Sequence, residues 1–202
     1  MLEYVLPEPT WNGRSKTAPL SAAGRVHQRY TRQSLGHLFV DRGYRHGAEV
    51  GVADGRFSLY LCQTIPHLHL LCIDPWKPYA GNRRGGGRTQ HELNFALAQE
   101  RLAAYHVEFW RMKSDEAAVR VVDGSLDFVY LDANHDSPYV DQDLGLWAPK
   151  VRAGGVLAGH DYYHFAHAGV VSAVNMYVQR HAISEWYLTD EREPSFWWTV
   201  NA

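Results

Sequence analysis

Short apolar segments alternate with longer amphipathic segments along most of this chain. The apolar runs lie at residues 46–52, 68–73, 106–112, 126–131 and 155–158. Apolar side chains at helical spacing occur between or after these runs, at residues 57–64, 90–104, 140–147 and 169–181. Short apolar strands separated by helices indicate a parallel sheet that is covered on both faces. The pattern therefore predicts an α/β fold with a doubly wound, mostly parallel sheet.

The two ends of the chain depart from this alternation. Residues 1–20 mix Pro, Gly, Ser and Thr, which favours an irregular arm, and residues 21–42 have the spacing of a helix that ends before Gly43. Near the C-terminus, aromatic segments at 185–188 and 195–200 flank a polar turn and predict an antiparallel hairpin. We divide the chain into an N-terminal arm and helix, residues 1–34, and one main domain, residues 35–202.

Composition narrows the classes of partner. The 202 residues are 46% hydrophobic and carry a formal net charge of -2, so no basic surface is expected for nucleic acid. Every apolar run is shorter than a membrane span, and the N-terminus has acids and prolines where an export signal needs basic and apolar residues. We expect a cytoplasmic protein with reduced, buried thiols at Cys62 and Cys72. The arm and the aromatic C-terminal strands are possible contact surfaces of a homo-oligomer.

A glycine loop follows the first strand of the main domain. Gly51 and Gly55 lie four residues apart at the change from strand to helix, and Glu49 precedes them. A dinucleotide-binding loop would have glycine where Ala53 and Arg56 stand, so a pyrophosphate is disfavoured. Asp74, at the end of the second strand and 23 residues beyond Gly51, can accept hydrogen bonds from both ribose hydroxyls. These features favour adenosine without a pyrophosphate; the alternative is a tight turn with a helix-capping acid.

This set, E-x-G-x-x-x-G with an acid ending the next strand, resembles the class I S-adenosylmethionine-dependent methyltransferases over about residues 35–200, which implies a Rossmann-like fold. The resemblance implies that the glycine loop passes under the methionine part of the cofactor, that Asp74 holds the ribose, and that Ser114 and Asp115 lie near the adenine. Asp115 could equally cap a helix that starts at Glu116. The predicted cofactor-binding residues are Glu49, Gly51, Gly55, Asp74, Ser114, Asp115 and Asp132.

A second group of polar residues follows the fourth and fifth strands. Asp132 and His135 come after residues 126–131, and His160 and Asp161 come after residues 155–158. Neighbouring parallel strands end at one edge of the sheet, so these side chains should share a crevice beside the cofactor. Transfer of a methyl group to an alcohol needs a base, a metal ion or both. A histidine can serve as base, and two carboxylates suit a hard ion such as Mg²⁺.

The string D-x-x-H-x-x-x-Y, followed by GGV and a D-Y pair, is similar to the macrocin and mycinamicin type of sugar O-methyltransferases. This resemblance implies that Asp132 and Asp161 bind a magnesium ion and that His135 is the base. His160 stands where that pattern has an acid, so the metal set would be Asp132, Asp161 and His160, which could prefer another divalent ion that tolerates nitrogen.

The sequence thus predicts a methyltransferase that moves a methyl group from S-adenosylmethionine to a hydroxyl of a small molecule, such as a sugar or natural product, with catalytic residues His135 and Asp132. Two alternatives stay open: an adenosine- or S-adenosylmethionine-binding protein without catalysis, and a metal-dependent hydrolase. Residues 79–88, rich in Gly and Arg, could be a lid that recognises an anionic substrate or a solvated loop.

Overall fold

The computed structural model describes residues 10–11, 14–15, 25–27, 30–79, 87–164 and 168–201. Its central feature is one eight-stranded sheet. The strands of this sheet are β3 (Arg25–His27), β4 (His46–Val50), β5 (His69–Ile73), β6 (Val107–Trp110), β7 (Leu126–Leu131), β8 (Val151–Gly159), β9 (Tyr187–Thr189) and β10 (Phe196–Thr199). The helices are α1 (Arg32–Asp41), α2 (Arg56–Thr64), α3 (Arg88–Leu102), α4 (Ser114–Ala118), α5 (Ser137–Trp147), the 3₁₀ turn Ala148–Lys150 and α6 (Val170–Arg180).

The strand order is β3-β9-β10-β8-β7-β4-β5-β6. Strands β8, β7, β4, β5 and β6 are parallel to one another, whereas β10 runs antiparallel to both β8 and β9. The mostly parallel sheet and the C-terminal antiparallel hairpin are therefore confirmed. Because the chain crosses from β6 at one edge back to β7 beside β4, the order reverses between β4 and β7, where open α/β sheets form their binding crevice.

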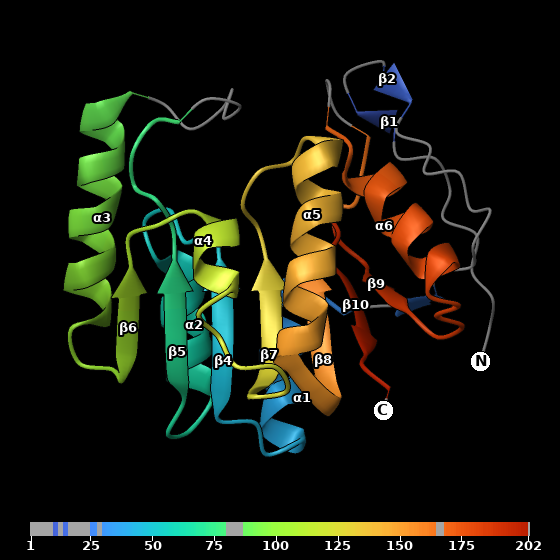
Figure 1. The fold of residues 1–202 in the computed structure, drawn as a ribbon, viewed down its shortest axis with the longest axis horizontal. Helices are drawn as coiled ribbons and strands as arrows, with labels where there is room; N and C mark the ends of the chain where they lie inside the picture. Colours follow the sequence, from blue (N-terminus) through green and yellow to red (C-terminus); the bar gives the residue numbers. More distant parts are fainter. Residues whose placement is uncertain are drawn as a thin grey trace.

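Helices cover both faces of the sheet (Figure 1). The side chains of each strand point alternately to the two faces and divide the core into two clusters. On one face, Phe128 and Tyr130 of β7 pack in a cluster with residues of α1, α2 and α3. On the other face, Val129 and Leu131 pack in a second cluster with residues of α4, α5 and α6. This period of two is why the strands read as nearly continuous apolar runs in the sequence.

The N-terminal part differs from its prediction. The predicted helix over residues 21–42 is wrong at residues 25–27, which form β3 and pair in parallel with β9, and α1 begins at Arg32. Thr31 is extended and forms a capping box with Ser34, and this arrangement starts the helix there.

In the described part of the arm, which was predicted to be irregular, strands β1 (Thr10–Trp11) and β2 (Arg14–Ser15) form a short antiparallel ladder. The rest of residues 1–24 and residues 80–86 of the predicted Arg/Gly lid lie outside the described residues. Both cysteines are free and buried, as predicted. Among the residues that the structure describes, none of the helices combines the length and apolar character needed to span a membrane.

Candidate functional site

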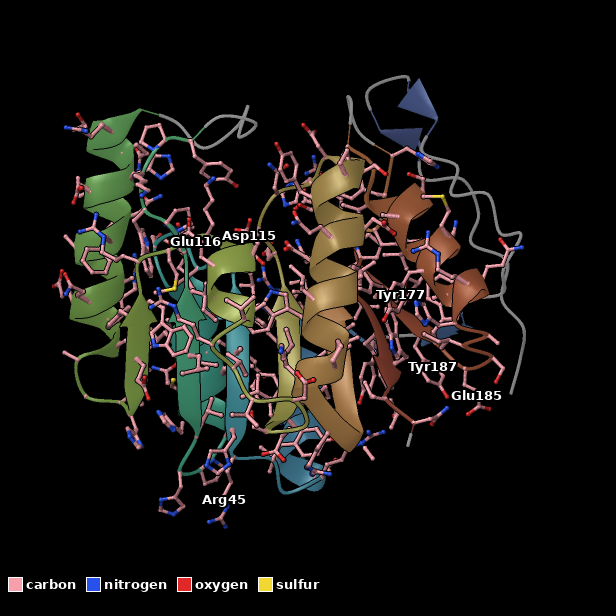
Figure 2. All side chains as sticks on the ribbon, in the orientation of Figure 1. Arg45, Asp115, Glu116, Tyr177, Glu185 and Tyr187 are labelled. Atoms are coloured by element: carbon pink, nitrogen blue, oxygen red, sulfur yellow. The ribbon has the colours of Figure 1, made fainter. Side chains whose placement is uncertain are left out.

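A pocket of about 120 Å³ opens at the carboxyl ends of β4, β5 and β7, beside the reversal in strand order. Figure 2 shows Asp115 at the start of α4 on this edge of the sheet, whereas Arg45 lies at the opposite edge. The lining residues come from the ends of three strands and from α4 and α5: Val50, Gly51, Ile73, Pro75, Tyr79, Lys113, Ser114, Asp115, Ala133, Asn134, Tyr139, Gln142 and Asp143. Of the predicted cofactor-binding residues, Gly51, Ser114 and Asp115 line this pocket.

The two loop glycines meet different constraints. Gly51 has φ +94°, and a Cβ there would lie 2.1 Å from the backbone oxygen of Asp132. Gly55 has φ +78°, and its Cβ would lie 3.0 Å from Ala98 of α3. Gly51 therefore lets the loop approach the end of β7, while Gly55 lets α2 pack closely on α3 and does not line the pocket.

Asp74, at the end of β5, organises the glycine loop. Its Oδ2 accepts hydrogen bonds from the backbone nitrogens of Val52 and Ala53, at 3.1 and 3.0 Å. Its Oδ1 accepts another from Trp76 N at 2.7 Å. Burial raises the pKa of Asp74, and these three bonds work in the opposite direction. The carboxylate thus fixes the loop geometry, a role that the sequence did not reveal, and retains limited acceptor capacity for a ribose.

Glu49 lies beneath the loop and away from the pocket lining. It is 1% exposed and accepts a hydrogen bond from Ser58 of α2. Burial raises the pKa of Glu49 to about 8, against the opposing effect of the Arg32 charge. Glu49 therefore supports the site from beneath by linking β4 to α2.

In the wall of the pocket formed by α4 and α5, the start of α4 is hydrogen-bonded to α5. Ser114 Oγ donates to Asp143 Oδ1 and accepts from Trp147 Nε1 at 2.7 Å. Asp115 is exposed in the first turn of α4, whose N-cap is Lys113. The buried carboxyl of Asp143 was not singled out from the sequence, because a lone acid within an amphipathic helix usually faces solvent.

The predicted second group comes together as one cluster. His135 Nε2 lies 3.4 Å from Asp132 Oδ1 and 3.1 Å from Asp161 Oδ2. His160 Nδ1 lies 3.2 Å from Asp161 Oδ1 and 3.9 Å from Asp132 Oδ2. Two carboxylates therefore alternate with two imidazoles, which is an arrangement able to receive and hold a proton.

Arg32, which the sequence did not single out, completes this cluster from the first turn of α1. Its Nη2 lies 2.8 Å from Asp132 Oδ2, and its guanidinium lies 3.9 Å above the Phe57 ring. Its backbone nitrogen donates to Glu191 Oε1 at 2.7 Å. The contact between Arg32 and Asp132 joins positions 100 residues apart, and only the fold could bring them together.

These contacts set the ionisation of Asp132. Burial by itself raises the pKa of Asp132, but the hydrogen bond from His135 and the charge of Arg32 outweigh it, so the pKa lies below its ordinary value. Asp132 is therefore held as a carboxylate at neutral pH.

The backbone of Asp161 is strained, since its φ of +60° is unusual for a residue with a side chain.

A second cavity of about 20 Å³ adjoins the pocket. Its walls include His135 and His160, and it shares Ala133, Asn134 and Asp143 with the larger pocket. The acid and histidine cluster therefore lies directly beside the larger pocket, at the same edge of the sheet.

A profile of the family described as "Methyltransferase domain" matches residues 48–162, more than half of the chain. The chain belongs to this family. It is a class I S-adenosylmethionine-dependent methyltransferase, and the matched segment contains both the glycine loop and the cluster at the ends of β7 and β8. No curated protein shows a significant match to the sequence.

Solved methyltransferases share the fold of this methyltransferase at low sequence identity. One is a putative O-methyltransferase from Klebsiella pneumoniae, with a TM-score of 0.62 and 16% identity over 84% of this chain and 79% of that chain. Another is the O-methyltransferase TomG from Streptomyces achromogenes, involved in tomaymycin synthesis and solved with S-adenosylmethionine, with a TM-score of 0.60, 16% identity and the same coverage.

A putative rRNA methylase from Clostridium thermocellum reaches a TM-score of 0.61 at 10% identity, over 85% of this chain and 97% of that chain. The same architecture therefore accompanies different acceptors, and the fold alone does not select one.

Proposed function

We propose that this methyltransferase transfers the methyl group of S-adenosylmethionine to a hydroxyl oxygen of a small molecule. The observation that carries the proposal is the adjacency of the two cavities, which share Ala133, Asn134 and Asp143. The larger cavity, over the glycine loop, would hold the cofactor. The cluster beside the smaller one would meet the acceptor. The acceptor could be a sugar or another natural product.

The cofactor would lie with its methionine part over Gly51 and its adenine beside α4. This orientation follows from the transfer itself, because the sulfonium methyl group must face the acceptor cluster at the end of β7. Asp74 would meet the ribose with the acceptor capacity left after its three backbone hydrogen bonds. Ser114 and Asp115, at the start of α4, also line the pocket.

In the reaction, the acceptor oxygen attacks the methyl carbon, the carbon–sulfur bond breaks, and S-adenosylhomocysteine leaves. His135 would take the hydroxyl proton. The carboxylates of Asp132 and Asp161, 3.4 and 3.1 Å from its Nε2, would stabilise the imidazolium that forms. Arg32 would hold Asp132 ionised for this role.

As an alternative to this base catalysis, the same residues fit a divalent ion, and His135 as a ligand would then not take the proton. One ligand atom each from Asp132, His135 and Asp161 lie within 4.8 Å of one another, and the donor set mixes two oxygens with one nitrogen. His160, which sequence reasoning placed in the metal set, lies beside Asp161 at 3.2 Å and could serve as a further nitrogen donor. A bound ion would supply Lewis-acid polarisation of the acceptor, and the nitrogen donors favour Mn²⁺ or Zn²⁺ over Mg²⁺.

Calorimetry with S-adenosylhomocysteine and with each divalent metal separately distinguishes this proposal from its two rivals. A methyltransferase binds S-adenosylhomocysteine with or without metal and turns over an acceptor. A non-catalytic binding protein binds S-adenosylhomocysteine but shows no turnover across a hydroxylated acceptor panel. A hydrolase binds metal tightly and has no affinity for S-adenosylhomocysteine, and that result would contradict the proposal.

A further inference from the structure

We propose that His69 and His106 bind a divalent transition-metal ion, such as Ni²⁺ or Zn²⁺, at the amino ends of the strands, with His46 beside them. Figure 2 shows Arg45, which precedes His46, at the edge of the sheet opposite to the pocket. The site is therefore separate from the acid and histidine cluster of the candidate active site. The inference does not depend on the proposed function.

The register of the sheet aligns three histidines in one row. His46 and His69 are the first residues of β4 and β5 and are partners in the ladder between these strands. In the next ladder, Leu70 pairs with Val107, and Leu70 N donates to His106 O at 3.1 Å. His106 is thus the neighbour of His69, one position before that pair. Partners on adjacent strands point to the same face of a sheet, so the three imidazoles lie along one face.

The distances between the rings place the pair His69 and His106 at the centre of the proposal. Their ring centroids are 4.1 Å apart and the rings are stacked at 5°. The His46 ring centroid is 6.1 Å from that of His69, at an interplanar angle of 71°. Stacked rings direct their nitrogens in parallel, so one ring must turn before both can bind the same ion. The His106 side chain is exposed, and a change of rotamer moves it through water and not through packed core.

Glu108 on β6 sets the tautomer of His69. Its Oε1 lies 2.9 Å from His69 Nε2, and its Oε2 accepts a hydrogen bond from Trp110 Nε1 at 3.1 Å. A carboxylate oxygen only accepts, so Nε2 of a neutral His69 carries the proton and Nδ1 keeps the lone pair. A carboxylate that accepts from one ring nitrogen and leaves the other to a metal is the usual outer partner of a metal-binding histidine.

The chemistry of the donors selects the ion. Two imidazole nitrogens, with water to complete the coordination, suit Ni²⁺, Cu²⁺ or Zn²⁺ better than Mg²⁺ or Ca²⁺. Strand β6 lies at one edge of the sheet, with β5 as its neighbour. An ion shared by His69 and His106 would therefore link the edge strand to β5 and stabilise the folded state.

The test is calorimetry with Ni²⁺ alone in the His135→Ala background, because this change removes the imidazole that Asp132 and Asp161 share. We expect one Ni²⁺ ion to bind per chain. Loss of the outer carboxylate in Glu108→Ala should weaken Ni²⁺ binding by roughly tenfold. His69→Asn and His106→Asn should each weaken it by at least as much, since each removes a ligand.

His37→Gln in the same background is the matched control, because His37 is an exposed histidine of α1 outside the row. It should keep the Ni²⁺ affinity of the parent. Chemical denaturation without metal verifies that each variant is folded, and Ni²⁺ should raise the melting temperature of the parent but not that of His106→Asn. Absence of Ni²⁺ binding by the His135→Ala protein, unchanged affinity in His69→Asn and His106→Asn, or an equal loss in His37→Gln would each overturn the inference.

Discussion

The two halves of the site are formed by different kinds of chemical group. The cofactor half depends on backbone: Gly51 at φ +94° passes against the end of β7, and Asp74 holds the loop through backbone nitrogens. The acceptor half depends on charged side chains: Asp132 and Asp161 share His135, and Arg32 reaches in from α1. Disruption of the first half should therefore damage folding and binding together, whereas disruption of the second should mainly affect the reaction.

Substitution of Gly51 is expected to have the largest effect on stability. Gly51→Val places a branched side chain where a Cβ alone would lie 2.1 Å from Asp132 O, so the loop and the end of β7 must separate. We expect a loss of more than about 4 kcal/mol in the free energy of unfolding, or failure to fold, measured by chemical denaturation.

Gly124→Ala is the control for this change, since Gly124 also has positive φ, at +67°, but no atom lies within 4 Å of its added Cβ. It should lose only about 1–2 kcal/mol from conformational strain. Similar losses at both positions would show that the close approach at Gly51 contributes nothing of its own.

His135→Ala tests the acceptor half. We expect turnover to fall by roughly 100-fold or more, because the proton loses its acceptor between Asp132 and Asp161. The affinity for S-adenosylhomocysteine should stay within about threefold of the wild type, as measured by calorimetry. A parallel loss of cofactor binding would mean that the two halves are not separable in the way their construction suggests.

Arg32→Met should have a smaller effect on stability than Gly51→Val. It leaves Asp132 without its guanidinium, and the paired side chains are 20% and 18% exposed, so we expect a loss of about 2 kcal/mol. Chemical denaturation gives this value, and Arg32→Lys should restore part of it because the cation remains. Equal stability of Arg32→Met and the wild type would exclude Arg32 as a support for Asp132.

A further expected effect is a pH dependence of stability from Glu49. The pKa of Glu49 is raised to about 8 from an ordinary 4.5, chiefly by burial, so the folded state favours the protonated form. Its contribution to stability is full below pH 4.5 and is lost as the pH rises through 8. We expect the melting temperature of the wild type, relative to that of Glu49→Gln, to fall between pH 5 and pH 8.5. A constant difference across this range would contradict the shift.

Local patterns predicted the edge of the sheet at which both halves of the site lie. The strand-loop-helix order around Gly51 follows from residues close in the sequence, and both predicted groups at the strand ends lie at one edge of the sheet, as parallel pairing requires. The N-terminal helix prediction failed at residues 25–27 because apolar spacing continues through them, whereas their pairing with β9 depends on a segment 162 residues further along the chain.

Arg32 and Asp143 were missed for a related reason. Each carries a charge within a helix, where exposure to solvent is the ordinary expectation. Only their partners distinguish them: Arg32 pairs with Asp132 across 100 positions, and Asp143 bonds Ser114 across 29. Such long-range pairs have no signature in the local sequence.

The most direct test of the account is a crystal structure of the methyltransferase with S-adenosylhomocysteine. The account predicts that the adenine lies beside α4, that the amino acid part lies over Gly51, and that the sulfur atom faces Asp132 and His135. A ligand bound elsewhere, or one with its sulfur turned away from the cluster, would contradict the claim that cofactor and acceptor meet at this edge of the sheet.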